Sequence, residues 1–212
     1  MKNIIFVPSL KEARSLFNID FNITDKGFYE GYLQNYKIIV SGVSKTNISI
    51  AATYTFTNEV PNVAYLVGIA GCYRQSDLNI GDVVCVCEDF FVDEGALVEN
   101  NLLMLHELGF GVCDFNRVGF NTVDNLPAVK SNTVSFLSSK DNLAEIYYNK
   151  TAADIENMEG ASFGLVCNKF KVTSFQIRAI SNHCGDRNKQ KWNAKKALDN
   201  LQKYLFENII KI

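Results

Sequence analysis

The sequence predicts a three-layer α/β fold with a mostly parallel central sheet, and two observations lead to that prediction. Runs rich in β-branched and aromatic residues, such as residues 3–7, 63–69 and 172–180, have the composition of strands buried on both faces. Helical patterns lie between them, among them residues 48–57 and 160–168. Strands that alternate with helices indicate helices packed on both faces of one sheet.

Length and charge limit the classes of function. The chain has 212 residues, of which 47% are hydrophobic, so we expect a single domain spanning residues 1–212. A net charge of -2 without a basic region argues against nucleic acid or an anionic membrane as a partner. No run approaches the roughly 18 apolar residues of a spanning helix, and the first apolar run is too short for a secretory signal. We therefore expect a cytoplasmic protein.

The cysteines and histidines do not predict a metal site. Six cysteines occur without a CxxC motif, and Cys85 and Cys87 lie on one face of an expected strand, where they are badly placed to bond each other. We expect free thiols that act as small buried hydrophobes. With only His106 and His183 available as imidazole ligands, we expect no bound metal.

The first strand, residues 3–7, is followed by a turn and a helix start. Ser9 and Glu12 have the spacing of a capping box. Capping is one role for Glu12, and chemistry at the carboxyl end of the strand is the other. The sequence by itself leaves both open.

Two strands, residues 26–32 and 37–40, are expected next, with a turn near Asn35. Gly42 then lies in a strand-to-helix turn, where a glycine lets the backbone approach a neighbouring group. The helix of residues 48–57 leads to the strand of residues 63–69.

The middle of the chain is expected to be less regular. A turn precedes a strand at Val83, and residues 88–95 are expected to form an acidic loop at the carboxyl end of that strand, with two phenylalanines. Residues 96–125 are the least informative, with a short helix expected near residues 102–108. Either mobility or oligomer contact would suit this segment.

The remaining elements are a strand over residues 128–134, a helix over residues 138–149 capped by Ser138 or Ser139, and a final helix within residues 192–210. The last of these carries a helical stripe of apolar residues.

The segment from residue 155 to residue 187 holds the strongest functional signal. Glu159 lies at the amino end of the helix of residues 160–168, where the helix dipole favours a carboxylate. Asn182 is expected just past the strand of residues 172–180, and ligands of open α/β sheets bind outside the carboxyl ends of the strands. We therefore expect the site here.

Two motifs in this segment carry a family resemblance. Residues 157–161 read Asn-Met-Glu-Gly-Ala and residues 178–182 read Arg-Ala-Ile-Ser-Asn. Together they resemble the nucleoside phosphorylase and nucleosidase superfamily, and most closely the futalosine hydrolases, nucleosidases of an alternative menaquinone pathway. The resemblance implies a three-layer α/β/α sandwich whose mixed sheet closes partly into a barrel.

The resemblance also implies three catalytic roles. Breaking an N-glycosidic bond passes through an oxocarbenium-like state, which needs a base for water, a group that holds the ribose and a group that stabilises the leaving purine. By resemblance, Glu12 activates the water, Glu159 binds the ribose hydroxyls with Met158 packed on the sugar, and Asn182 contacts the purine. Arg178 is expected to pair internally rather than to touch substrate.

Further substrate-binding residues are expected from the same resemblance. The loop Ile69, Ala70 and Gly71 matches the Gly-x-Ala-Gly loop beneath the nucleoside, although many members have Ser or Thr where Ile69 stands. Gly42 lies in the turn near the ribose, where this chain has Ser44 in place of a second glycine. Phe91 belongs to a segment near the mouth of the site, and His183 could line the base pocket.

Asn182 predicts the leaving base. Members that act on 6-aminopurines generally have Asp here, whereas an amide offers donors to N7 and O6 of a 6-oxopurine. The expected reaction is hydrolysis of futalosine to hypoxanthine and dehypoxanthinylfutalosine. Arg74, Arg117 and Arg187 are candidates to meet the carboxylate of the futalosine extension.

Three alternatives remain open. The chain could be a purine nucleoside phosphorylase, although Glu12 lies where a phosphorylase tends to keep a Gly-rich anion loop. It could be a nucleosidase for methylthioadenosine or aminofutalosine, which Asn182 disfavours, or a catalytically silent nucleoside-binding protein. We expect a homo-oligomer, because members of the superfamily complete their sites near subunit interfaces. We expect no cofactor, because this chemistry requires neither a metal nor an organic group.

Overall fold

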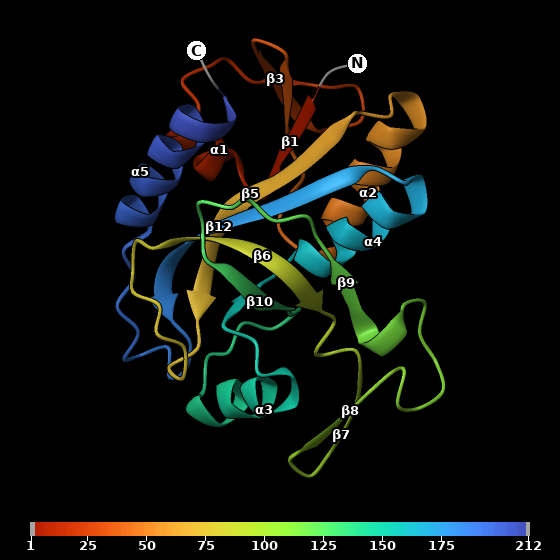
Figure 1. Cartoon of the computed structure of the whole chain (residues 1–212), viewed down its shortest axis with the longest axis vertical. Coiled ribbons are helices and arrows are strands. Elements are labelled where there is room, and N and C mark those ends of the chain that lie inside the picture. The colour runs from red at the N-terminus through yellow and green to blue at the C-terminus, as the bar shows by residue number, and fades with distance from the viewer. Residues whose placement is uncertain (1–2, 211–212) are drawn as a thin grey trace.

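The computed structural model describes residues 3–210 (Figure 1). The strands are β1 (Asn3–Val7), β2 (Asn22–Ile23), β3 (Tyr29–Leu33), β4 (Tyr36–Val40), β5 (Val63–Cys72), β6 (Val83–Phe90), β7 (Gly95–Val98), β8 (Asn101–Met104), β9 (Arg117–Gly119), β10 (Ala128–Thr133), β11 (Ile155–Asn157) and β12 (Thr173–His183). The helices are α1 (Leu10–Leu16), α2 (Lys45–Asn58), α3 (Asp141–Thr151), α4 (Gly160–Phe170) and α5 (Ala194–Tyr204), with a 3₁₀ turn at Asp114–Asn116 and a π-helical turn at Leu205–Ile209.

The central sheet is mixed and closes on itself. Its strand order is β11-β10-β6-β12-β5-β1-β4-β3-β2, and β11 also pairs with β5. The five strands β5, β12, β6, β10 and β11 therefore form a closed barrel, from which β1, β4, β3 and β2 extend. The pairs of β5 with β1 and with β12 are parallel, whereas β12 with β6 and β11 with β5 are antiparallel. The expected partly barrel-like mixed sheet is confirmed.

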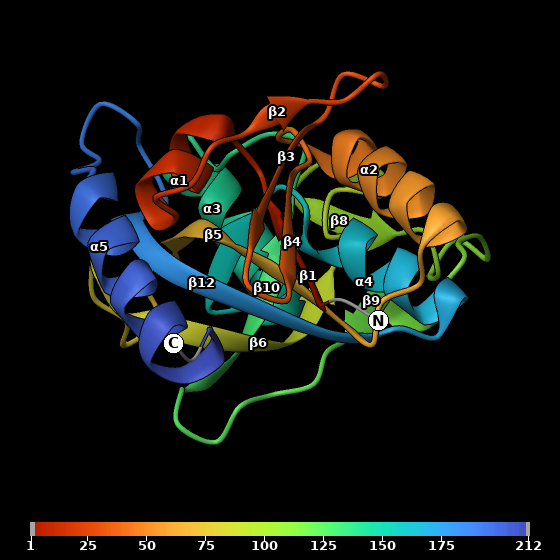
Figure 2. The same cartoon turned by 90° about the horizontal axis from the view of Figure 1, so that it is seen from above.

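Helices cover both faces of the sheet, which confirms the three-layer architecture. Helices α1 and α5 lie on one side and α2 and α4 on the other, with β1, β5 and β12 between them (Figures 1 and 2). On the α5 side, Leu201 and Leu205 pack with Ile5 and Val67 of the sheet. On the opposite side, the ring of Phe6 packs against other phenylalanines of that face. Burial of apolar side chains on both faces holds the layers together.

Helix α3 closes the lower end of the barrel in Figure 1 and the β7–β8 hairpin lies beside it. The expected helix over residues 102–108 is wrong, because residues 101–104 form β8 and turns follow. Leu102 and Met104 are buried while Leu103 between them is partly exposed, so the apolar pattern here has the period of a strand.

Three other boundaries differ from expectation. Strand β12 continues to His183, so Asn182 lies within the strand instead of beyond it. Strand β6 runs to Phe90, so the expected acidic loop begins later. Helix α3 begins at Asp141 without a side-chain cap, because Ser138 bonds Glu156 instead.

The expected free cysteines are confirmed, since none of the six forms a disulfide. Among residues 3–210, the helices are too short or too polar to cross a bilayer.

Candidate functional site

A cavity of about 170 Å³ opens where β5, β11 and β12 meet the first turns of the chain. It is lined by Pro8, Glu12, Val43, Ile69, Ala70, Gly71, Leu137, Glu156, Asn157, Met158, Glu159, Ser181, Asn182, Arg187, Gln190 and Trp192. The lining brings together the three residues expected to be catalytic, which are separated by up to 170 positions in the sequence. A largely preformed pocket with a few convergent polar groups has the character of a small-molecule site.

Glu12 is held in the cavity wall by two donors. The Ser9 hydroxyl donates to Oε1 at 2.7 Å and the Ile69 backbone N–H donates to Oε2 at 3.2 Å. Ser9 also caps α1 by accepting from the Glu12 N–H, so the expected helix start is confirmed while the Glu12 carboxylate is turned toward the cavity. Burial raises the pKa of Glu12 above its usual value, and the nearby charge of Glu159 adds to that effect.

Glu159 occupies the capping position of α4, as expected from the sequence. Its Oε1 accepts from the Ser44 backbone N–H at 3.3 Å, and its Oε2 accepts from Arg178 Nη2 at 3.2 Å. Both side chains of this ion pair are almost fully buried, with 0% of Arg178 and 4% of Glu159 exposed. Arg178 thus pairs internally, and Ser44 contributes through its backbone.

A buried polar network fixes the orientation of this pair. Asn157 Oδ1 accepts from Arg178 Nη2 at 3.0 Å and from the N–H groups of Glu159 and Gly160. Its amide nitrogen donates to Asp89 Oδ2 at 2.7 Å. Burial raises the pKa of Asp89 to about 6, against the lowering effect of its hydrogen-bond donors. These bonds join Asn157, Arg178 and Glu159 in one buried network, so Glu159 has little freedom to move, although Arg178 Nε has no partner among the described residues.

Asn182 lies on β12, the strand that also carries Arg178, and lines the same cavity. Its Oδ1 accepts from the Ser181 hydroxyl at 2.8 Å and its Nδ2 donates to the His183 carbonyl at 3.2 Å. A Cβ on Gly71 would stand 3.2 Å from Asn182 Nδ2, so the glycine gives the amide room. The second amide hydrogen of Asn182 is left for a ligand.

The structure places the other expected binding residues in two groups. Ile69, Ala70, Gly71 and Met158 line the cavity. Gly42, Phe91 and His183 do not line it. Gly42 has a φ of +85° and precedes Val43, which belongs to the lining. Phe91 is buried, with the ammonium of Lys45 over its ring. The ring of His183 contacts the thiol of Cys72. A direct role for these last three in binding has no support from their positions.

Sequence reasoning missed Glu156 and Asn157 as site residues. Both are 3% exposed and line the cavity, and Glu156 accepts from Ser138 N at 2.9 Å. Two polar residues inside a three-residue strand between apolar neighbours were the available signal, since buried polar groups need dedicated partners.

Of the three arginines considered for a carboxylate, Arg187 lies at this cavity. Its guanidinium stands over the Trp192 ring, 5.5 Å from the centroid, and makes no ion pair within residues 3–210. Arg74 pairs with Asp141 and Arg117 with Glu88, both away from the cavity. The mouth therefore offers one cation beside an aromatic surface.

The arrangement suits acid–base chemistry on a small-molecule ligand. The carboxylates of Glu12 and Glu159, which come from different segments, line the same cavity as the Asn182 amide. In the part of the chain that the structure describes, no three His, Cys, Asp or Glu side chains gather as metal ligands would.

Known proteins that are similar in sequence belong to the phosphorylase superfamily or are nucleosidases. The model of the family described as "Phosphorylase superfamily" matches residues 132–211. The futalosine hydrolase of Thermus thermophilus is 31% identical over 76% of this chain and 75% of that protein. The 5′-methylthioadenosine/S-adenosylhomocysteine nucleosidase of Exiguobacterium is 26% identical over 77% of this chain and 75% of its own length.

Solved structures share the fold. The native futalosine hydrolase of Helicobacter pylori superposes with a TM-score of 0.77 at 20% identity, over 97% of this chain and 95% of that one. A mutant of the H. pylori 5′-methylthioadenosine nucleosidase with 5′-methylthioadenosine in its active site gives a TM-score of 0.77 at 20% identity, over 96% of each chain.

Proposed function

The chain belongs to the phosphorylase superfamily, among its futalosine and methylthioadenosine nucleosidases, and from that membership we propose that it hydrolyses futalosine to hypoxanthine and dehypoxanthinylfutalosine. The class of activity, N-glycosidic hydrolysis of a nucleoside, is shared by these relatives. The identity of the substrate as futalosine and a place in menaquinone biosynthesis are what we propose. The observation that supports futalosine is the amide of Asn182, which lies in the same cavity as Glu12 and Glu159.

In the proposed mechanism, Glu12 takes a proton from water as the water oxygen attacks C1′. The raised pKa of Glu12 supports this role, because a base is most effective when its pKa lies close to the working pH. The bond from C1′ to purine N9 breaks and its electrons pass to the base. Glu159 accepts hydrogen bonds from the ribose hydroxyls and stabilises the positive charge that develops on the sugar.

Asn182 would hold the departing purine. Its available amide hydrogen suits an acceptor such as N7 or O6, which a 6-oxopurine provides together. Proton donation from the amide does not occur, so N7 or N9 is protonated by solvent after departure. A neutral amide therefore stabilises the leaving group by hydrogen bonding alone.

Arg187 supports futalosine over smaller nucleosides. A benzoate-bearing extension beyond C5′ needs a cation for its carboxylate and an apolar surface for its ring. Arg187 over Trp192 at the cavity mouth supplies both, and its guanidinium is free of an acidic partner among residues 3–210. A methylthio group would use neither feature.

A second candidate is a 5′-methylthioadenosine/S-adenosylhomocysteine nucleosidase. It is favoured by the relatives that bear that name at 25% to 28% identity. The two candidates differ in the base released, adenine or hypoxanthine, and this difference can be measured directly.

The test is release of free base from futalosine, aminofutalosine, inosine and methylthioadenosine, each with and without phosphate. We expect hypoxanthine from futalosine without a need for phosphate, and much slower release from inosine, which lacks the extension. Adenine release from methylthioadenosine as the main activity would contradict the futalosine proposal. Strict dependence on phosphate would instead indicate a phosphorylase. If no substrate released a base, the protein would be a catalytically silent binding protein.

A further inference from the structure

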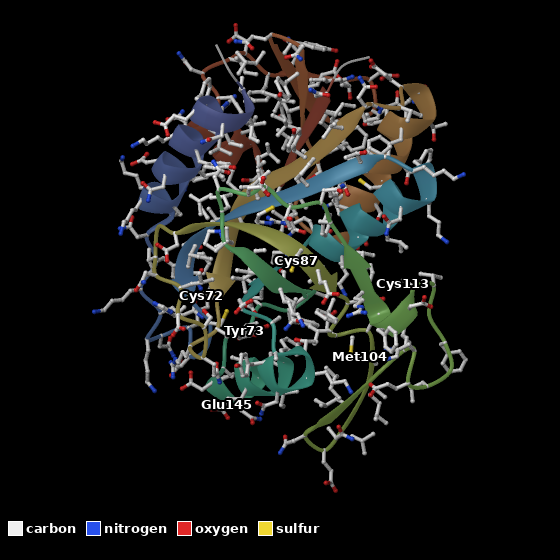
Figure 3. The ribbon with its side chains drawn as sticks, in the orientation of Figure 1. Cys72, Tyr73, Cys87, Met104, Cys113 and Glu145 are labelled. Atoms are coloured by element: carbon white, nitrogen blue, oxygen red, sulfur yellow. The ribbon has the colours of Figure 1, made fainter. Side chains whose placement is uncertain are left out.

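We propose that Asp89 is a positioning residue that fixes the start of α4 from the core, and with it the carboxylate of Glu159. The inference deepens the proposed function and rests on the role given there to Glu159. Strand β6 crosses the middle of the molecule, where Cys87 is labelled in Figure 3, and Asp89 follows two residues later on the same strand. Asp89 is fully buried and does not line the cavity, so any effect on the ligand must pass through other side chains.

Helix α4 takes no cap from the side chain at its capping position. Glu159 occupies that position, yet its carboxylate bonds Ser44 and Arg178 and none of the helix N–H groups. A helix leaves its first N–H groups without partners inside the helix, so a buried start needs acceptors from elsewhere. Because other groups meet this need, the Glu159 carboxylate is available to the cavity.

Two side chains supply those acceptors. Asn157 Oδ1 accepts from the N–H of Glu159 at 2.8 Å and from that of Gly160 at 2.6 Å, in the pattern of a capping side chain. Thr133 Oγ1 accepts from the N–H of Ala161 at 2.8 Å. Three consecutive N–H groups at the start of α4 are thus held by two side chains, both of residues that are at most 3% exposed.

Asp89 sets the orientation of both acceptors. Its Oδ2 accepts from Asn157 Nδ2 at 2.7 Å and its Oδ1 accepts from the Thr133 hydroxyl at 2.7 Å. An Asn amide has donors on one side and an acceptor on the other, so an acceptor at Nδ2 turns Oδ1 toward the helix. The Thr133 hydroxyl gives its single hydrogen to Asp89, which leaves its oxygen to accept from α4. Ser131 Oγ also accepts from Asn157 Nδ2, but a hydroxyl can equally donate and does not fix the amide by itself.

The same amide oxygen bonds the guanidinium beside the site. Asn157 Oδ1 accepts from Arg178 Nη2 at 3.0 Å, and that nitrogen also donates to Glu159 Oε2 at 3.2 Å. If the Asn157 amide turned over, its NH₂ group would face the guanidinium and the helix N–H groups, which are all donors. Asp89 opposes that inversion, so the backbone and the carboxylate of Glu159 are both positioned by one buried group.

Hydrogen exchange in the first turn of α4 tests the hold of Asp89 without any substrate. In Asp89→Asn, residue 89 keeps one acceptor atom in place of two, so Asn157 and Thr133 cannot both stay as they are. We expect amide exchange in residues 159–161, followed by mass spectrometry, to become roughly tenfold faster, the order for one weakened hydrogen bond. Exchange at the wild-type rate would overturn the proposal.

Kinetics show whether that hold reaches the ribose. If Asp89 acts through Glu159, Asp89→Asn should lower kcat/KM for a riboside about tenfold and for its 2′-deoxy form much less, because the second substrate lacks a hydroxyl for Glu159 to bind. The substrate pair is futalosine and 2′-deoxyfutalosine, or methylthioadenosine and its 2′-deoxy form if that nucleoside is the one cleaved. Equal losses on both substrates would contradict the positioning role, because a merely structural defect lowers the two rates alike.

Exchanging the two polar side chains offers a rescue. Asn157→Asp alone sets two carboxylates against each other, and we expect kcat/KM to fall about a hundredfold. In the double variant Asp89→Asn/Asn157→Asp, the new amide donates to the new carboxylate, which still accepts from Arg178 and the helix N–H groups. The amide of Gln176, whose Oε1 has no partner among the described residues, can turn to accept from residue 89. We expect the double variant to recover roughly tenfold over Asn157→Asp; no recovery, in a double variant that unfolds cooperatively on heating, would defeat the proposal.

Asp154→Asn is the matched control. Asp154 is partly buried, and its carboxylate accepts from the Lys130 N–H of β10 at 2.9 Å rather than bonding α4. The control should keep the wild-type exchange of residues 159–161 and the wild-type ribose preference, and changes equal to those of Asp89→Asn would argue against a specific role for Asp89. If no nucleoside releases its base, the proposed function fails, while the exchange experiment still decides whether Asp89 holds the start of α4.

Discussion

Gly68 leaves room for the side chains of Glu12 and Arg178 beside strand β5. A Cβ at this position would stand 2.8 Å from Glu12 Oε2, 3.0 Å from Arg178 Nη1 and 3.1 Å from Pro8 Cδ. The first of these contacts is shorter than Cβ atoms make in folded proteins and the other two are tight, so a side chain at residue 68 would force Glu12 to move. The position of the Glu12 carboxylate therefore depends on the absence of a side chain at residue 68.

Gly68→Ala should lower kcat more than it lowers stability. The added methyl group displaces Glu12 from its bond to Ile69, and a misplacement of about 1 Å in a catalytic group costs on the order of a hundredfold in rate. Steady-state kinetics and thermal unfolding of the same samples measure the two effects. Gly119→Ala is the control, because a Cβ there meets only the Cys87 carbonyl at 3.9 Å, and equal rates in both variants would contradict the explanation.

Glu12→Gln should abolish most turnover while substrate still binds. Loss of a general base costs about 100- to 10,000-fold. Because burial raises the pKa of Glu12, the wild-type kcat/KM should fall as the pH drops through a value above 4.5, where the carboxylate takes up a proton. Initial rates between pH 4 and pH 8 check this, and the residual activity of the variant should lack that acidic limb. A variant with full turnover would remove Glu12 from the mechanism.

At the scale of elements, the start of α4 and the short strand β11 form one unit with β12. Asn157 of β11 bonds the first N–H groups of the helix and the guanidinium of Arg178, and Arg178 bonds Glu159. A three-residue strand has few ladder bonds of its own. The polar contacts to β12 therefore hold the segment that carries Glu159 in place.

Arg178→Gln should destabilise the fold strongly. Removing one partner of a buried ion pair leaves an uncompensated charge on Glu159 and costs about 3–5 kcal/mol. Urea unfolding followed by circular dichroism gives the change in free energy. Lys195→Gln breaks an exposed pair with Asp199 and should change stability little. Similar losses in the two variants would mean that the buried pair is not the stabilising feature.

Most elements of this fold could be predicted from sequence, and the failures have identifiable causes. Runs such as residues 3–7 are apolar enough to be buried strands in any context. Residues 101–104 were misread because four alternating residues fit a helix or a strand equally well, and the choice depends on packing beside α3. Barrel closure by β11 was expected only from family resemblance, because nothing local in three residues specifies pairing with both β5 and β10.

The candidate site was predictable to a similar extent. Glu159 and Asn182 stood out as polar residues at the ends of apolar runs, whereas the family resemblance gave Glu12 its role, and the structure places all three in one cavity. The backbone donors of Ser44 and Ile69 could not be chosen, because a role through the backbone leaves no mark on residue type. Their contribution depends on register across the barrel.

At the scale of the whole molecule, Asp89 links the buried network to pH. It is fully buried at the junction of β6, β10, β11 and β12, with donors from Thr133, Asn157 and Gln176. Its pKa is raised to about 6 from 3.8, mainly by burial. Between these values the folded protein holds a proton that the unfolded chain has lost, so the contribution of Asp89 to stability declines as pH rises from about 4 to about 6.

Asp89→Asn should flatten the dependence of stability on pH. The amide cannot ionise, so relative to the wild type the variant should gain up to roughly 3 kcal/mol on going from pH 4 to pH 7, since each pKa unit corresponds to about 1.4 kcal/mol. Free energies of unfolding from urea titrations at several pH values, for both proteins, provide the comparison. Parallel curves for the two proteins would show that Asp89 does not titrate in this range.

The position of Asn182 in the cavity wall has a consequence for directed evolution of this enzyme. The amide is the group proposed to hold the departing base, so a library randomised at this codon would sample new leaving bases and would lose turnover at the same time. Gly71 is the codon that such a library should leave untouched, because a Cβ there would stand 3.0 Å from Cys184 Sγ and 3.2 Å from Asn182 Nδ2. Base preference and rate are therefore expected to change together at this position.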